Sequence, residues 1–167
     1  DKVPYDLWRD QGYLIATPGE TVDVDFIFED ILYIIKNYRC KMIGYDPWKA
    51  TALRNRVMKK VNPSEDKHGF QMVEVRQGPK TMHEPSEALL ARTLEGLVRH
   101  GGHPVLDWCM DNIVMRKDAN ANIAPDKEKS SERIDLAVAG IIGMRVLQLD
   151  WKDNQKLSSD SLTISGP

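Results

Sequence analysis

The sequence has 167 residues, of which 41% are hydrophobic and 29% are charged, and its formal net charge is −2. This length suits one domain, and the recurrence of apolar residues along most of the chain excludes global disorder. The slightly acidic balance excludes a protein that holds polyanions by its overall charge, so any contact with nucleic acid must come from local basic faces.

The first half of the chain predicts helices that alternate with short strands. Apolar side chains recur at helical spacing over residues 23–38 and again over residues 47–61. The alternation of residues 22–26 would also suit a strand, but the helical spacing that follows favours a helix. Strands are expected at residues 41–45, which Asp46 and Pro47 end, and at residues 71–76.

The second half predicts further helices and a β-hairpin. The turn-like residues 118–122, between extended residues 112–117 and Ile123, predict the hairpin. The expected helices span residues 85–100, which Gly101 and Gly102 stop, residues 105–111, and a last helix through Ile134, Val138, Ile141 and Ile142.

The alternation of strands and helices favours an α/β fold with a partly parallel sheet. We expect one domain over residues 1–150 and a mobile polar tail over residues 151–167. Cys40 and Cys109 lie far apart without a C-x-x-C motif, which argues against disulfides and favours a reducing compartment. The chain opens without an initiator Met or a secretory signal, so we expect a cytosolic fragment of a longer protein.

Two carboxylates stand out by their position. Asp46 follows an apolar strand, and open α/β sheets bind ligands beyond the carboxyl ends of their strands. Asp135 interrupts the apolar start of the last helix, and Glu132 lies one turn before it on the same face. Acids that converge from different elements could hold two divalent ions for phosphoryl chemistry. Spacing alone favours the simpler interpretation, in which Asp46 caps its helix and Asp135 is a solvated helix residue.

Basic and aromatic residues offer weaker candidates. Arg54, Lys59 and Lys60 lie on the outer side of the helix over residues 47–61 and could steer DNA through its phosphates, although a solvated face is the commoner explanation. The chain has no P-loop motif, so it does not itself bind ATP in that way. Tryptophans are more often core or interface anchors than base-stacking platforms, and the four here are Trp8, Trp48, Trp108 and Trp151.

A series of sequence blocks resembles the large subunit of tailed-phage terminases. The blocks are residues 4–8 (PYDLW), 12–14 (GYL), 17–19 (TPG), 43–48 (IGYDPW), 75–78 (VRQG), 99–108 (RHGGHPVLDW), 112–114 (NIV) and 126–135 (DKEKSSERID). Their order and spacing span residues 4–145, which makes the set specific although each block alone is weak.

The resemblance implies the C-terminal nuclease domain of a bacteriophage or prophage packaging motor, with a ribonuclease-H-like mixed sheet flanked by helices. It implies an endonuclease that cuts concatemeric double-stranded viral DNA by a two-metal mechanism with Mg²⁺ or Mn²⁺. Asp46 and Asp135 match the family's acids, so we expect them to be catalytic metal ligands, with Glu132 as an auxiliary ligand. The implied partners are double-stranded DNA, the terminase small subunit, the portal protein and an upstream ATPase domain of the same polypeptide, in the host cytoplasm and without a membrane.

The sequence departs from the family at one point. The family carries another essential aspartate on the first strand of its sheet, upstream of the segment that matches residues 4–8. We therefore expect the chain to lack its first strand or strands, and we do not expect Asp6 or Asp10 to replace that acid. Such a fragment would bind metal weakly and cut little or no DNA. The alternative function is a non-catalytic module that docks the motor to the portal or to partner subunits, and a resolvase- or transposase-like relative of the same fold is remoter.

Overall fold

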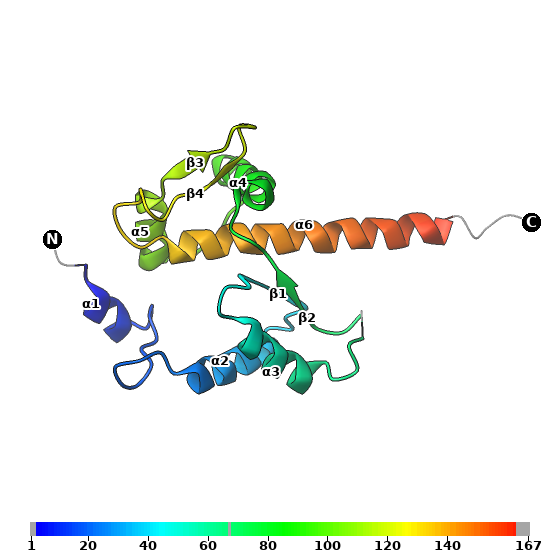
Figure 1. The fold of residues 1–167 in the computed structure, drawn as a ribbon, viewed down its shortest axis with the longest axis horizontal. Helices are drawn as coiled ribbons and strands as arrows, with labels where there is room; N and C mark the ends of the chain where they lie inside the picture. The colour runs from blue at the N-terminus through cyan, green and yellow to red at the C-terminus, as the bar shows by residue number, and fades with distance from the viewer. Residues whose placement is uncertain (1–2, 67, 163–167) are drawn as a thin grey trace, which may run out of the picture.

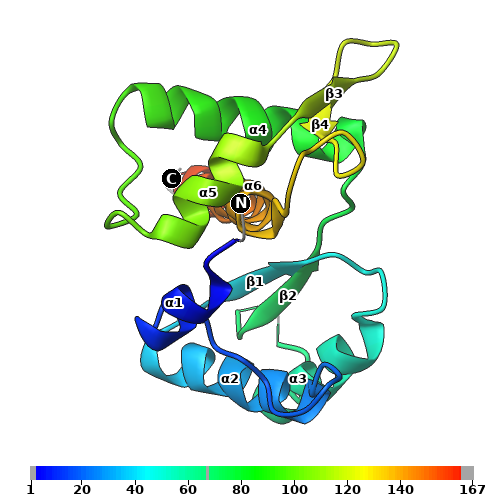
Figure 2. The same ribbon diagram turned by 90° about the vertical axis from the view of Figure 1, so that its left-hand side faces the viewer.

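The computed structural model describes residues 3–66 and 68–162, which form a mixed α/β arrangement (Figure 1). A sheet of two parallel strands, β1 (Met42–Tyr45) and β2 (Gln71–Glu74), lies between two layers of helices. Helices α2 (Val24–Asn37) and α3 (Thr51–Val61) form one layer, and the long helix α6 (Asp135–Leu162) passes over the other face of the sheet (Figure 2). Beside α6 lie α4 (Pro79–Leu94), α5 (Pro104–Asn112) and a hairpin of β3 (Met115–Lys117) and β4 (Ile123–Pro125).

Helix α2 forms as its 3.6-residue pattern predicts. Asp23 caps the helix, because its Oδ1 accepts the backbone N–H groups of Asp25 at 2.9 Å and Phe26 at 3.1 Å. The inner face buries Phe28 together with Val57 of α3 and Phe70. The strand alternative for residues 22–26 is therefore wrong.

Strands β1 and β2 pair in parallel, with Met42 opposite Gln71 and Tyr45 opposite Glu74. The chain passes from one strand to the other through α3, which supplies the crossover that parallel neighbours require. The partly parallel sheet predicted from the sequence is therefore confirmed for these two strands. The predicted hairpin is confirmed as well, since β3 and β4 pair antiparallel.

Two apolar clusters hold α6 against its neighbours. The first joins Val75, just after β2, with Met82 of α4 and with Val138 and Ile141 of α6. The second joins Trp8, Val105, Cys109 and Ala137. Trp8 belongs to helix α1 (Tyr5–Asp10), and its ring lies 5.5 Å from that of Trp108. The predicted role of core anchor therefore holds for Trp8.

Helix α4 differs from its prediction at both ends. It begins at Pro79 and not near residue 85, and Pro85 is buried inside it. It ends at Leu94 and not at residue 100, because Gly96 takes a left-handed conformation (φ 69°). The N–H of Gly96 donates to the Thr93 carbonyl and the N–H of Leu97 to the Arg92 carbonyl, which is a Schellman motif. Gly96, and not Gly101, is therefore the stop signal.

Two other boundaries also differ. Helix α3 begins at Thr51 and not at residue 47, because Lys49 has a left-handed backbone (φ 60°) that a helix cannot contain. Helix α6 continues to Leu162, so the backbone stays helical through most of the segment predicted as a tail, and residues 163–167 lie outside the described part. In the part of the chain that the structure describes, no helix combines the length and apolar character needed to span a membrane.

Candidate functional site

Asp46 lies at the carboxyl end of β1, where the chain turns toward α3. Its side chain is half-buried, and its Oδ1 accepts the backbone N–H of Trp48 at 2.9 Å. The next turn is closed by the Ala50 N–H, which donates to the Pro47 carbonyl at 3.3 Å. These contacts hold the carboxylate in a defined orientation at the edge of the sheet.

Strand β1 lies against α6 at Gly44, two residues before Asp46. Side chains alternate along a strand, so the face that carries Gly44 would also carry residue 46 if the strand continued. A Cβ atom at Gly44 would lie 2.5 Å from Ile142 Cγ2 and 2.7 Å from Val146 Cγ2, both on α6. The ladder continues past the last pair, because the Val75 N–H donates to the Tyr45 carbonyl at 2.8 Å. Extended pairing therefore reaches the residue that precedes Asp46.

Asp135 is the first residue of α6 and is exposed. Lys127, in the loop before the helix, lies with its Nζ 3.0 Å from Asp135 Oδ1. The two side chains are 51% and 67% exposed, so water screens the ion pair and its contribution to stability is small. The amino end of a helix favours a carboxylate, which is a second reason for an acid at this position.

Asp135 shares a helical face with the residues of α6 that touch β1. Positions 135, 139, 142 and 146 follow one another at intervals of four, three and four, which keeps them on one stripe of the helix. Ile142 and Val146 are the residues that lie against Gly44. Asp135 is two turns from Ile142, a rise of about 10 Å along the helix axis. Asp135 therefore lies on the same helical stripe as the two residues of α6 that lie against β1, nearer the amino end of the helix.

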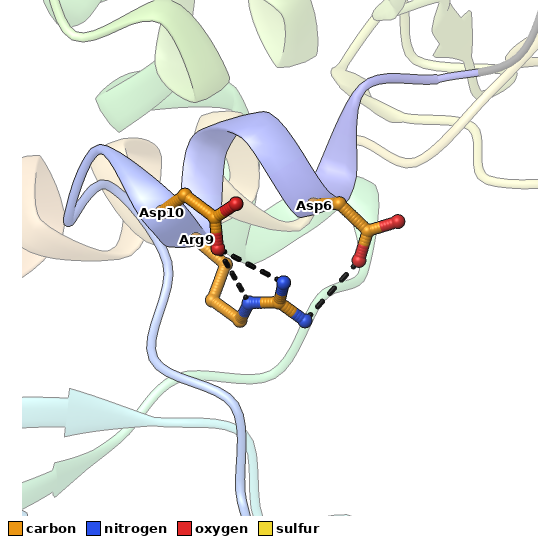
Figure 3. Close-up of polar contacts among 3 residues, drawn as sticks. All are labelled: Asp6, Arg9 and Asp10. Carbon is orange, nitrogen blue, oxygen red and sulfur yellow. Dashed lines mark hydrogen bonds and ion pairs between the residues drawn. The ribbon is translucent and has the colours of Figure 1, made fainter.

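Other acids do not complete a larger group. Glu132 is exposed in the loop before α6, and among the described residues no three His, Cys, Asp or Glu side chains come together as a metal site. Asp6 and Asp10 both form ion pairs with Arg9 on α1 (Figure 3). The Arg9 Nη1 atom lies 3.2 Å from Asp6 Oδ1, and the Arg9 Nη2 atom lies 2.9 Å from Asp10 Oδ1. The hydrogen bond from Arg9 to Asp10 is the main cause that raises the pKa of Arg9.

The predicted DNA-contacting residues lie on α3, in the layer on the other side of the sheet from α6. Arg54 is half-buried, and its Nη1 donates to Asn55 Oδ1 at 3.1 Å. It also lines a hollow of about 210 Å³ with Met58 and Asn62. Lys59 and Lys60 are exposed in the last turn of α3, at the end of the helix far from Asp46.

Sequence reasoning missed the partners of the two aspartates. Lys127 belongs to a charged loop without periodicity, so no pattern marked its contact with Asp135. The sequence favours an anchor role over a stacking role for each tryptophan, yet Trp48 is 78% exposed. The signal that was available is its position in the sequence, two residues after Asp46.

Comparisons with known proteins place the chain in a family. A family model described as "Terminase large subunit, endonuclease domain" matches residues 1–149. The terminase large subunit of Enterobacteria phage HK97 is 38% identical over 141 residues, which cover 83% of this chain and 26% of that protein. Protein YmfN of Escherichia coli K12 is 28% identical over 153 residues, which cover 90% of this chain and 32% of that protein.

A solved structure shares the fold. The crystal structure of the HK97 large terminase superimposes with a TM-score of 0.75 at 36% sequence identity, over 86% of this chain and 29% of that one. The chain thus spans between a quarter and a third of the relatives that it matches.

Proposed function

Because the chain belongs to the terminase large subunit endonuclease domain family, we propose that it is a divalent-metal-dependent nuclease domain that cuts concatemeric double-stranded DNA during genome packaging. Asp46 and Asp135 are its proposed metal ligands. The observation that supports this assignment is the close approach of Ile142 and Val146 on α6 to Gly44, which stands two residues before Asp46 on the chain.

The donor atoms at the two positions suit a hard cation. Asp46 uses Oδ1 for the Trp48 N–H and Asp135 uses Oδ1 for Lys127, while the second oxygen of each carboxylate has no partner among the described residues. Mg²⁺ and Mn²⁺ prefer carboxylate oxygens and keep several waters. The proposed set of two ions would lower the pKa of the attacking water and offset charge on the phosphate oxygens.

The residues of the chain supply orientation and charge to this reaction. The Trp48 N–H fixes the direction of the Asp46 carboxylate. Lys127 balances the charge of Asp135 and, being exposed and flexible, can turn toward a DNA phosphate when the carboxylate is engaged elsewhere. Arg54, Lys59 and Lys60 are proposed to guide the duplex toward the site by their charge.

We further propose that a third acid arrives on an additional strand beside β1, as in a ribonuclease-H-like sheet. The carbonyls of Lys41 and Tyr45 accept hydrogen bonds from the β2 side, so the backbone groups of Met42 and Gly44 face the opposite edge of β1. In the described part of the chain no strand pairs with that edge. An unpaired edge is a ready partner for another strand. Glu132 is the proposed auxiliary ligand beside Asp135.

The test compares Asp46→Ala and Asp135→Ala with the parent in the full-length protein, with Glu128→Ala as the control for an exposed acid in the same loop. Both aspartate variants should lose Mn²⁺-dependent cleavage of a duplex while keeping the unfolding midpoint measured without metal. Mn²⁺ should raise the midpoint of the parent and of Glu128→Ala but not that of Asp46→Ala. Cutting retained by either aspartate variant would refute the assignment, and a parent indifferent to Mn²⁺ would favour a non-catalytic docking module.

The wider partners follow from the role of the family in packaging. We propose that the domain works with the terminase small subunit, the portal protein and an ATPase domain of the same polypeptide, in the host cytoplasm. Copurification of the full-length protein with the portal protein would test the docking part of this proposal.

A further inference from the structure

The side chain of Trp48 is the most exposed aromatic group of the described residues. It is 78% exposed, whereas Trp8 is 7% exposed and packs against Trp108. A single exposed apolar residue is common on protein surfaces and needs no special explanation. The position of Trp48 relative to the proposed nuclease site is what sets it apart.

The backbone of Trp48 is bound directly to the proposed catalytic carboxylate. Its N–H donates to Asp46 Oδ1 at 2.9 Å. Pro47 fixes one backbone angle of the turn, and its carbonyl accepts the Thr51 hydroxyl at 3.4 Å and the Ala50 N–H at 3.3 Å. The indole is therefore presented to solvent from a held turn beside Asp46.

The neighbour of Trp48 adds a positive charge to the same turn. Lys49 is exposed, has no ion pair among the described residues, and keeps a left-handed backbone (φ 60°) that is unfavourable for a side chain with a Cβ atom. An aromatic and a cationic residue in succession match the two chemistries of a nucleotide, a flat base and a phosphate.

We infer that Trp48 contacts DNA at the edge of the proposed nuclease site, where its indole stacks on a nucleobase that is displaced from the duplex next to the scissile phosphate. This inference rests on the proposed function, because a phosphodiester bound at Asp46 would lie next to the turn that carries Trp48 and Lys49. DNA is therefore the occupant that the geometry favours over a protein partner. Apolar side chains that enter a base step unstack it locally, and stacking on an aromatic ring offsets part of that cost.

The test uses the full-length protein and two labelled duplexes of one length, one fully paired and one with a central mismatch that loosens its bases. Affinity is measured by fluorescence anisotropy in a chelator, so that no cutting occurs. The parent should bind the mismatched duplex more tightly, and Trp48→Ala should lose about tenfold in affinity for it and most of the preference. Trp48→Phe should keep most of both, because phenylalanine preserves a stacking surface.

Trp151 provides the matched control, since it is 65% exposed but lies on α6 more than four turns beyond Asp135. Trp151→Ala should bind both duplexes as the parent does. Parent-like affinity and preference in Trp48→Ala, or an equal loss in Trp151→Ala, would overturn the inference.

Cleavage assays in Mn²⁺ separate this inference from the proposed function. If the parent cuts and Asp46→Ala does not, the nuclease assignment holds whatever Trp48→Ala does. In that case, parent-like DNA binding by Trp48→Ala would refute only the proposed contact of the indole with DNA. A parent that neither binds nor cuts either duplex would remove both proposals.

Discussion

Replacing Gly44 by alanine tests the contact on which the relation between Asp46 and Asp135 depends. The added Cβ would lie 2.5 Å from Ile142 Cγ2 and 2.7 Å from Val146 Cγ2, whereas carbon atoms in contact prefer about 3.5–4 Å. Both methyl groups belong to β-branched residues, which have one strongly preferred rotamer in a helix and so cannot turn away. The strand and the helix must therefore move apart by about 1 Å, and overpacking of this kind costs about 1–3 kcal/mol.

The effect on cutting should exceed the effect on folding. Asp46 lies two residues beyond Gly44, and a displacement of about 1 Å in a catalytic group can lower a rate about 100-fold. We expect Gly44→Ala to lower the free energy of unfolding by about 2 kcal/mol in urea denaturation and to cut a duplex about 100-fold more slowly at a temperature where it stays folded.

Gly143→Ala is the matched control, one residue after Ile142 on α6. A Cβ there meets no atom within 4 Å, and alanine in place of a helical glycine should raise stability by about 0.5–1 kcal/mol. The two glycine variants should thus change stability in opposite directions. A Gly44→Ala protein as stable as the parent would refute the close approach of β1 to α6.

Two further predictions concern charged contacts. Lys127→Ala removes an ion pair whose side chains are more than half exposed and which contributes about 0–1 kcal/mol to stability. The variant should therefore bind Mn²⁺ at most about fivefold more tightly in calorimetry, whereas Lys129→Ala should bind it as the parent does. Weaker Mn²⁺ binding by Lys127→Ala would show that Lys127 supports the site. The pKa of Asp118 is held below its usual value, chiefly by the Asn122 side-chain amide and also by the backbone N–H groups of Asn122 and Asn120. A lowered folded-state pKa means that this stabilisation is complete above the unfolded-state pKa and is lost as the pH falls through the folded-state pKa. Amide exchange in the hairpin should therefore rise at acid pH in the parent relative to Asp118→Asn, and equal pH profiles would count against the contact.

The sequence predicts best those helices and strands that are marked by a cap, a turn or a proline within a few residues. A specific backbone conformation is set by the cap at Asp23, by the proline after β1 and by the turn at Asp118. These three signals correctly predict α2, β1 and the hairpin. The predicted end of helix α4 differs from the observed end because Leu97 and Val98 continue the apolar spacing past Gly96. A helical repeat cannot show where a left-handed glycine ends the helix, and Gly101 and Gly102 offered a second plausible stop.

The candidate site was predictable only in part, for a related reason. Asp46 and Asp135 could be chosen from the residues that flank them, because a strand end and a helix start are local features. The spacing between them depends on how α6 lies on the sheet, and that packing is set at Gly44, Ile142 and Val146. The residues next to Gly44 in the sequence do not reveal this contact with α6. The residues next to Lys127 likewise do not reveal its ion pair with Asp135.

A glycine on the α6 side of β1 has a consequence for the proposed chemistry. A larger residue at position 44 would hold the strand away from the helix, and the carboxylate two residues later would move with the strand. Asp46 is half-buried directly after a paired strand, whereas Asp135 is exposed at a helix start. One ligand is then rigid and the other accessible, so Asp135 can exchange Lys127 for a cation while Asp46 stays fixed. Metal entry in the proposed site therefore requires no rearrangement of the sheet, only the release of one solvent-exposed ion pair.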